Sequence, residues 1–174
     1  HSIACGVAAR ILATHRNETN AERFFVSGLL HDIGSLVIYS QMPEVGGQAL
    51  VQARDAQKLL HQVERQELGF DHAMVGGLLL REWKLPEGLV EMVMYHHRPD
   101  KATKHPQETA ALHVSDIVVH GLELGSSGET FVPTLDSRAW ASLGLPKGFL
   151  SRLVSLLDQH YQDAVVHILG ARKG

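Results

Sequence analysis

The sequence predicts an all-α protein, an orthogonal bundle of seven to eight helices. Apolar residues recur at three- and four-residue intervals along most of the chain, which is the spacing of one face of a helix. No stretch shows the clear alternation of apolar and polar residues that marks a half-buried strand. We therefore expect helices packed across one another around a core rather than a sheet or a regular parallel bundle.

The first two helices are predicted at residues 1–13 and from Ala21 onward. Residues 1–13 place apolar side chains at positions 3, 4, 7, 8, 11 and 12, on one helical face. No capping residue precedes this segment, so we expect a fragment that lacks upstream helices. The second helix carries His31 and Asp32 in its later part, where Gly34 predicts close packing or a helix irregularity.

Three further helices are predicted in the middle of the chain. Residues 43–47 predict a break, and a single polar helix follows at about 48–66. Asp71 is suited to cap a helix over 72–83. Pro86 opens the next helix at an early position, and that helix runs to the His96-His97 doublet.

The remaining helices complete a single predicted domain over residues 1–174. A helix at about 108–124 holds Asp116 among apolar neighbours, and residues 125–133 are expected to form a loop. A short helix at about 136–143 and a final amphipathic helix at about 147–169 follow.

Composition limits the classes of function. The chain has 174 residues and 44% hydrophobic content, enough for one core. A net charge of −3 gives no reason to expect a nucleic-acid-binding surface, and no apolar run is long enough for a membrane span. Cys5 is the single cysteine, which excludes an internal disulfide and fits a reducing compartment. We predict a cytoplasmic protein with no nucleic-acid or membrane partner.

Histidine is the unusual residue type, with twelve copies. Several histidines and two aspartates stand at the ends or on the inward faces of predicted helices, and we take them as candidate metal ligands: His1, His31, Asp32, His72, His96, His97 and Asp116. Imidazoles with carboxylates suit one or two divalent transition metals such as iron, manganese, zinc or nickel, whereas calcium and magnesium prefer oxygen ligands. Asp32 is the natural bridging ligand and the only candidate catalytic residue, if the centre hydrolyses phosphoesters with an acidified water.

Separate structural roles are the alternative for these residues. Histidines near helix ends can cap the helix, and Asp116 can pair with another buried polar group. Separate roles would require six inward-facing polar groups in one core without a common purpose, so we favour the shared site. The other histidines are expected on the surface or on helix faces, with His113 and His120 flanking Asp116: His15, His61, His105, His113, His120, His160 and His167.

Residues 1–125 resemble the HDOD (HD-related output domain) family of the HD superfamily. The resemblance is carried by four stretches: His1-Ser2 at the start of a helix; Leu29-Leu30-His31-Asp32-Ile33-Gly34; Gly69-Phe70-Asp71-His72 through Trp83-Lys84-Leu85-Pro86 to His96-His97; and Leu112-His113-Val114-Ser115-Asp116. It implies a bundle of the HD-domain type and a regulatory output module of bacterial signalling proteins. It also implies that all seven candidate residues are metal ligands, and that the partners are other signalling domains or proteins, with a nucleotide as a possible ligand.

Two departures separate the chain from the related HD-GYP phosphodiesterases. Those enzymes follow the histidine doublet with an Asp-Gly-x-Gly-Tyr-Pro segment, whereas this chain has Arg98-Pro99-Asp100. They also commonly carry lysine where this chain has Ser35, and without that cation a developing phosphate charge is less stabilised. The leading prediction is therefore a regulatory module that retains a metal site. A metal-dependent phosphohydrolase acting on a nucleotide or cyclic nucleotide is the second hypothesis, and a di-iron oxygenase is the third.

Overall fold

The computed structural model describes residues 1–170, and within that range the protein is all-helical, as predicted. These residues form ten α-helices and one 3-10 helix, more than the seven to eight expected: α1 Ser2–His15, α2 Glu22–Leu30, α3 Ile33–Gln41, α4 Pro43–Asp55, α5 Leu60–Leu68, α6 His72–Glu82, α7 Glu87–Tyr95, η1 Pro99–Lys101, α8 Pro106–Gly121, α9 Ser137–Ser142 and α10 Phe149–Leu169. No helix in this range is both long and apolar enough to cross a bilayer.

One error in the helix prediction concerns residues 48–66, which are divided between α4 and α5. Pro43 begins α4 instead of separating helices, because its fixed φ suits the first position of a helix. The turn that ends α4 contains Gln57 with φ 53°, a left-handed conformation that a continuing helix does not allow. Since residues 56–59 contain neither proline nor glycine, no local pattern predicted this break.

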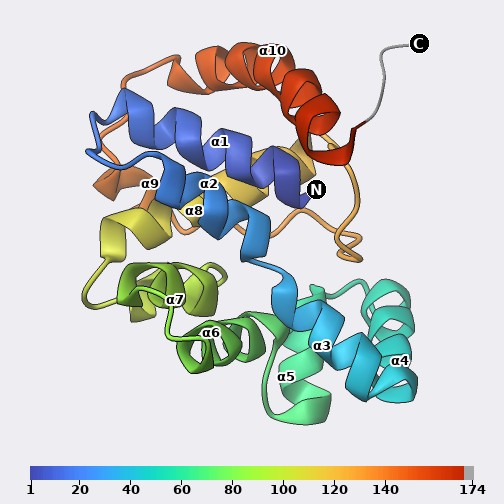
Figure 1. Cartoon of the computed structure of the whole chain (residues 1–174). Coiled ribbons are helices and arrows are strands. Elements are labelled where there is room, and N and C mark those ends of the chain that lie inside the picture. Colours follow the sequence, from blue (N-terminus) through green and yellow to red (C-terminus); the bar gives the residue numbers. More distant parts are fainter. Residues whose placement is uncertain (171–174) are drawn as a thin grey trace.

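The second error concerns the helix expected from Ala21. It ends at Leu30, and α3 begins at Ile33, so His31 and Asp32 form a turn between two helices. In Figure 1, α1, α2, α8 and α10 lie in the upper half of the molecule and α3 to α6 in the lower half. The α2–α3 turn joins the two halves, and it therefore places His31 and Asp32 where ligands from both can converge.

The main core surrounds α1. Residues 4–9 and 11–13 are all buried there, and side chains from α2, α8 and α10 pack against them, such as Phe24, Leu112 and Leu153. Burial of each large side chain of this kind contributes about 1.5–3 kcal/mol. Smaller clusters lie between α6 and α7 and between α4 and α5. α1 is therefore held on several sides, which fixes the position of its first turn.

Two glycines allow the helices to approach closely enough to form the site. A Cβ atom at Gly28 would overlap the backbone of Gly6, so α2 crosses α1 in direct backbone contact near Cys5. A Cβ atom at Gly34 would overlap the carbonyl of His72, so α3 meets the first turn of α6 in the same way. The packing at Gly34 is one of the two outcomes that the sequence predicted there. The helix irregularity lies just before it, at the α2–α3 turn.

Candidate metal centre

The structure brings all seven predicted residues together around the α2–α3 turn. His1 precedes α1, His31 and Asp32 form the turn, and His72 is the first residue of α6. His96 and His97 follow α7 directly, and Asp116 lies within α8. Asp71 caps α6 as predicted, since its side chain accepts a hydrogen bond from the backbone N–H of Met74 at 2.8 Å.

The first half of the centre lies beside α1 and α8. Nε2 of His1 is 3.0 Å from Oδ1 of Asp116, and Nε2 of His31 is 3.6 Å from the same oxygen. The Sγ atom of Cys5 lies 3.4 Å from Nε2 of His1. One ligand atom from each of these four residues lies within 4.8 Å of the others. Cys5 is thus an additional donor at the centre that was not among the predicted ligands.

The second half of the centre lies beside α6 and α7. Nε2 of His72 is 2.8 Å from Nε2 of His97, and ligand atoms of His72, His96 and His97 lie within 4.8 Å of one another. Asp32 stands between the halves. Its Oδ2 is 3.2 Å from Nε2 of His31, and its Oδ1 is 3.5 Å from Nε2 of His72. The two oxygens of this carboxylate face different groups of donors, the position that a bridging ligand requires.

Local hydrogen bonds orient the imidazole rings of His31 and His96. Nδ1 of His31 donates to the carbonyl of Gly28 at 2.7 Å, and Nδ1 of His96 donates to the carbonyl of Val93 at 2.7 Å. Because a carbonyl only accepts, Nδ1 carries a proton in both rings and Nε2 is directed into the centre. Nε2 of His96 is buried and makes no hydrogen bond within the described residues, whereas Nε2 of His31 faces the carboxylates of Asp32 and Asp116. Buried polar atoms normally have a partner, so the donor set fits a metal cation.

Glu64 is a functional candidate that the sequence analysis missed. It is 1% exposed, and its Oε2 accepts hydrogen bonds from Nδ1 of His72 at 2.6 Å and from the backbone N–H of His72 at 2.9 Å. Carboxylates in this position fix the tautomer of a metal-binding histidine. No local motif marks Glu64, since it lies on a different helix from His72; only the packing of α5 against α6 reveals it.

The buried charges shift the pKa values of the centre in opposite directions. Burial lowers the pKa of His96 to about 3, and the charge of His31 adds to this effect. Burial also disfavours a charged His72, but the hydrogen bond and charge of Glu64 outweigh it and raise the pKa to about 9. For Asp32, burial is outweighed by the charge and hydrogen bond of His31, and the pKa falls to about 2. The centre is therefore built around ionised carboxylates and at least one neutral imidazole.

Two histidines expected on the surface or on helix faces, His61 and His113, are buried beside the centre. The ring of His61 stacks on that of His97 with centroids 4.1 Å apart and an interplanar angle of 15°. His113 is 2% exposed and donates from Nδ1 to the carbonyl of His96 at 2.7 Å. Both lie on helix faces, one of the two places predicted for them, and helices α5 and α8 direct these faces toward the doublet. His120 lies against the centre, with Nδ1 2.9 Å from Oδ1 of Asp116.

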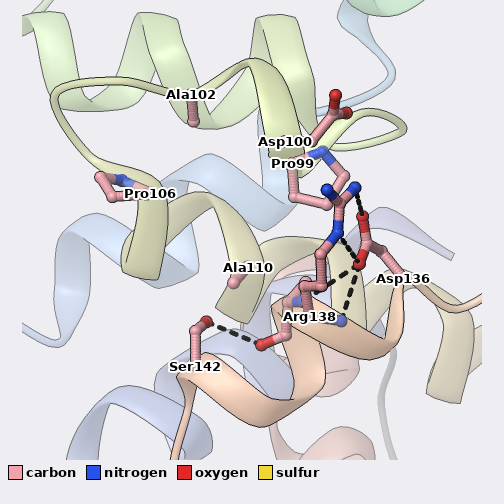
Figure 2. Close-up of a pocket in the computed structure, with 9 residues that line it drawn as sticks. Pro99, Asp100, Ala102, Pro106, Ala110, Asp136, Arg138 and Ser142 are labelled. Carbon is pink, nitrogen blue, oxygen red and sulfur yellow. Dashed lines mark hydrogen bonds and ion pairs between the residues drawn. The ribbon is translucent and has the colours of Figure 1, made fainter.

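His113 also connects the centre to a cavity on the far side of α8. Its Nε2 accepts a hydrogen bond from the backbone N–H of Asp136 at 3.0 Å. Asp136 caps α9 and lines a cavity of about 250 Å³ with Pro99, Ala110 and Arg138. Figure 2 shows the guanidinium of Arg138 lying against the Asp136 carboxylate, and the two atoms Nη2 and Oδ2 are 3.0 Å apart. The charge of this arginine is therefore neutralised within the cavity wall.

The loop predicted at 125–133 lies along one edge of the centre. Gly125 sits directly against the backbone of His1, and Oγ of Ser127 is 3.0 Å from Nε2 of His120. Farther along, Oε2 of Glu129 accepts a hydrogen bond from the backbone N–H of Leu60 at 2.6 Å. The loop thus links α1 and α8 to α5. The Asp32 side chain is 16% exposed, so solvent reaches the middle of the centre.

Comparisons with known proteins agree with this fold. A family model described as the HDOD domain matches residues 1–99. No curated protein matches the chain significantly. A solved HDOD domain protein of unknown function from Geobacter sulfurreducens is 23% identical with a TM-score of 0.76, covering 97% of this chain and 61% of that protein. A candidate phosphohydrolase from Shewanella amazonensis is 23% identical with a TM-score of 0.72, covering 94% of this chain and 59% of that protein.

A third solved structure is a response regulator from Methylococcus capsulatus. It is 25% identical with a TM-score of 0.58, and the match covers 87% of this chain and 57% of that protein. The chain therefore spans about three fifths of the length of each of these three proteins. The shared part is the helical fold that assembles the centre.

Proposed function

The chain belongs to the HDOD domain family, and we propose that it is a regulatory output domain of bacterial signal transduction that retains a metal centre. Similar folds occur in a response regulator and in a candidate signal transduction protein from Marinobacter aquaeolei, which is 18% identical with a TM-score of 0.76 over 97% of this chain and 38% of that protein. Its partners in this proposal are other signalling domains or proteins. A cytoplasmic location remains a prediction from the sequence.

The metal centre rests on one observation above all. The buried Nε2 atom of His96 makes no hydrogen bond within residues 1–170, and together with Nε2 of His31 it points toward Asp32. In this proposal His1, His31 and Asp116 hold one divalent transition metal, and His72, His96 and His97 hold a second. Asp32 is shared between them. Imidazole-rich donors with carboxylates favour iron, manganese, zinc or nickel over calcium or magnesium.

A regulatory role is favoured by what surrounds the centre. Ser35, at the position of the lysine in the HD-GYP pattern, is 5% exposed and brings no positive charge. The segment after the doublet folds into the short helix η1 at Pro99–Lys101 in place of the Gly-Tyr-Pro segment of those enzymes. The centre thus lacks two features of the HD-GYP phosphodiesterases while it keeps the full donor set.

A metal-dependent phosphohydrolase acting on a nucleotide or cyclic nucleotide is the second candidate. It is supported by the complete donor set and by the solvent-exposed edge of Asp32. The chemistry available from such a centre is the acidification of a water molecule, which then serves as a nucleophile. Asp32 would be the residue that positions this chemistry, since its carboxylate reaches both groups of donors.

Metal content tests the centre directly. Elemental analysis of protein purified without chelator is expected to show one or two transition-metal ions per chain, and Asp32→Ala is expected to lose most of that metal. Asp55→Ala is the matched control, because the Asp55 carboxylate is 65% exposed and pairs only with neighbouring Arg54. If the purified protein contains no near-stoichiometric metal and also fails to bind added Mn²⁺ or Fe²⁺, the proposed centre is wrong.

Turnover separates the two candidate functions. The metal-loaded protein is incubated with a panel of nucleotides and cyclic nucleotides, and a regulatory domain is expected to leave them intact. Hydrolysis that disappears in Asp32→Ala and persists in Asp55→Ala would establish the phosphohydrolase in its place. The metal measurement is made on the same preparations, so an absent activity is not confused with an empty site.

A further inference from the structure

A second site lies in a groove between α1 and α10, away from the metal centre. The groove has a volume of about 500 Å³, within the range of small-molecule pockets. Its lining contains two arginines, Arg10 and Arg152, beside apolar residues such as Ile11 and Phe149, and no acidic residue. The chain as a whole has a net charge of −3, so this concentration of basic side chains stands out against the rest of the protein.

The groove is distinct from the metal centre. It lies at the C-terminal end of α1, where Thr14 and His15 are found, whereas His1 precedes the first turn of the same helix. The groove begins at Arg10, and at 1.5 Å per residue this part of α1 lies about 14 Å or more from His1 along the helix axis. A ligand in the groove therefore makes no contact with the predicted metal ligands.

The arginines of the groove are available to an anion to different degrees. Arg152 lies in the first turns of α10 and is exposed. Arg10 is held over the Phe25 ring, and its Nη1 is 3.5 Å from Oε1 of Glu22, an exposed carboxylate at the rim. An exposed ion pair of this length is weak and is easily exchanged for a better anion. By contrast, Arg138 in the other cavity is already bonded to Asp136.

The floor of the groove is apolar. Ile11 is 9% exposed and Phe149 is 3% exposed, and the ring of His15 lies against that of Phe149 with centroids 4.1 Å apart. A fully solvated inorganic ion would make no use of this surface. A small molecule that carries both a phosphate group and an apolar or aromatic body would contact the arginines and the floor together.

We propose that the α1–α10 groove binds a small organic phosphate of about nucleotide size, with Arg152 and Arg10 contacting the phosphate and the body lying over Ile11 and Phe149. Guanidinium groups bind phosphate oxygens through paired, charge-assisted hydrogen bonds. The site is a binding site, and no reaction is assigned to it.

Calorimetric titration of the full chain with AMP, adenosine and inorganic phosphate tests the proposal. AMP is expected to bind more tightly than either of its parts, and added salt is expected to weaken AMP binding. Arg152→Ala is expected to weaken AMP binding by about tenfold or more, the loss of one charge-assisted contact. Glu22→Gln is expected to tighten it by about two- to fivefold, because a competing carboxylate is removed from Arg10. Arg138→Ala serves as the control and should bind as the wild type does.

Three results would overturn the proposal. Adenosine or inorganic phosphate binding as tightly as AMP would show that the phosphate and the floor do not act together. Unchanged AMP binding by Arg152→Ala would remove the central contact. Phosphates also bind metals, so each titration is repeated after chelator treatment. Loss of AMP binding in chelator would place the ligand at the metal centre and away from the groove.

Discussion

Gly34→Ala is a direct test of how the helices form the centre. A Cβ atom at this position would overlap the carbonyl of His72 and would lie 2.6 Å from the backbone nitrogen of Gly76. Ordinary contacts begin at about 3.4 Å, so α3 and α6 must separate by about 1 Å. Both obstacles are backbone atoms, which cannot move aside through a change of side-chain rotamer. The strain must therefore be taken up by movement of a whole helix.

Overpacking against fixed neighbours destabilises the fold by about 1–3 kcal/mol. The higher helix propensity of alanine over glycine offsets about 0.5–1 kcal/mol of this loss. For a chain of this size each kcal/mol changes Tm by about 2–4 °C, so we expect Gly34→Ala to lower Tm by several degrees. Metal binding is affected more strongly. Metal–ligand distances tolerate only about 0.2 Å, and a 1 Å separation pulls His72 away from Asp32. We expect at least about a tenfold loss of metal affinity.

Gly47→Ala is the matched control, because Gly47 also lies within a helix but has no atom within 4 Å of its added Cβ. It should raise stability by about 0.5–1 kcal/mol through helix propensity alone and leave metal affinity unchanged. Both variants are followed by thermal unfolding and by metal titration. If Gly34→Ala behaves as Gly47→Ala does in both measurements, the direct contact between α3 and α6 is not what positions the ligands.

The other predictions concern metal loading and two buried carboxylates. Added metal at about one hundred times its Kd should stabilise the protein by about 2.7 kcal/mol, a rise in Tm of about 5–10 °C that chelator reverses and Asp32→Ala abolishes. Glu64→Ala leaves two donors of His72 without an acceptor, so urea unfolding should show a free energy of unfolding lower by about 1–3 kcal/mol. Metal titration should show an affinity weaker by roughly 10- to 100-fold. Glu91 accepts hydrogen bonds from the backbone N–H groups of residues 103–105. Burial raises the pKa of Glu91, but these hydrogen bonds outweigh burial and lower the pKa below its usual range. A lowered pKa stabilises the fold at pH values above the usual pKa of a glutamate, so Glu91→Gln should destabilise the protein at pH 7. The stability difference between variant and wild type should shrink as the pH falls through the lowered pKa of Glu91.

The sequence alone predicted the class of fold and the set of candidate ligands. Helical periodicity depends on local spacing, and it was therefore readable for α1, α6, α8 and α10. The donors of the centre were predicted because the histidines and aspartates stand beside apolar helical segments, and because their order resembles that of the HDOD family. Their role as ligands remains the prediction that metal analysis will test.

Only the tertiary structure decided where the helices break and which polar groups support the centre. The turn at His31 and Asp32 replaces a continuous helix, because α2 and α3 pack in different halves of the molecule. Glu64 and His61 lie on a helix whose inward face is defined only by its packing against α6 and the doublet. Contacts between residues distant in the chain depend on how helices cross, and hydrophobic spacing within one helix does not carry that information.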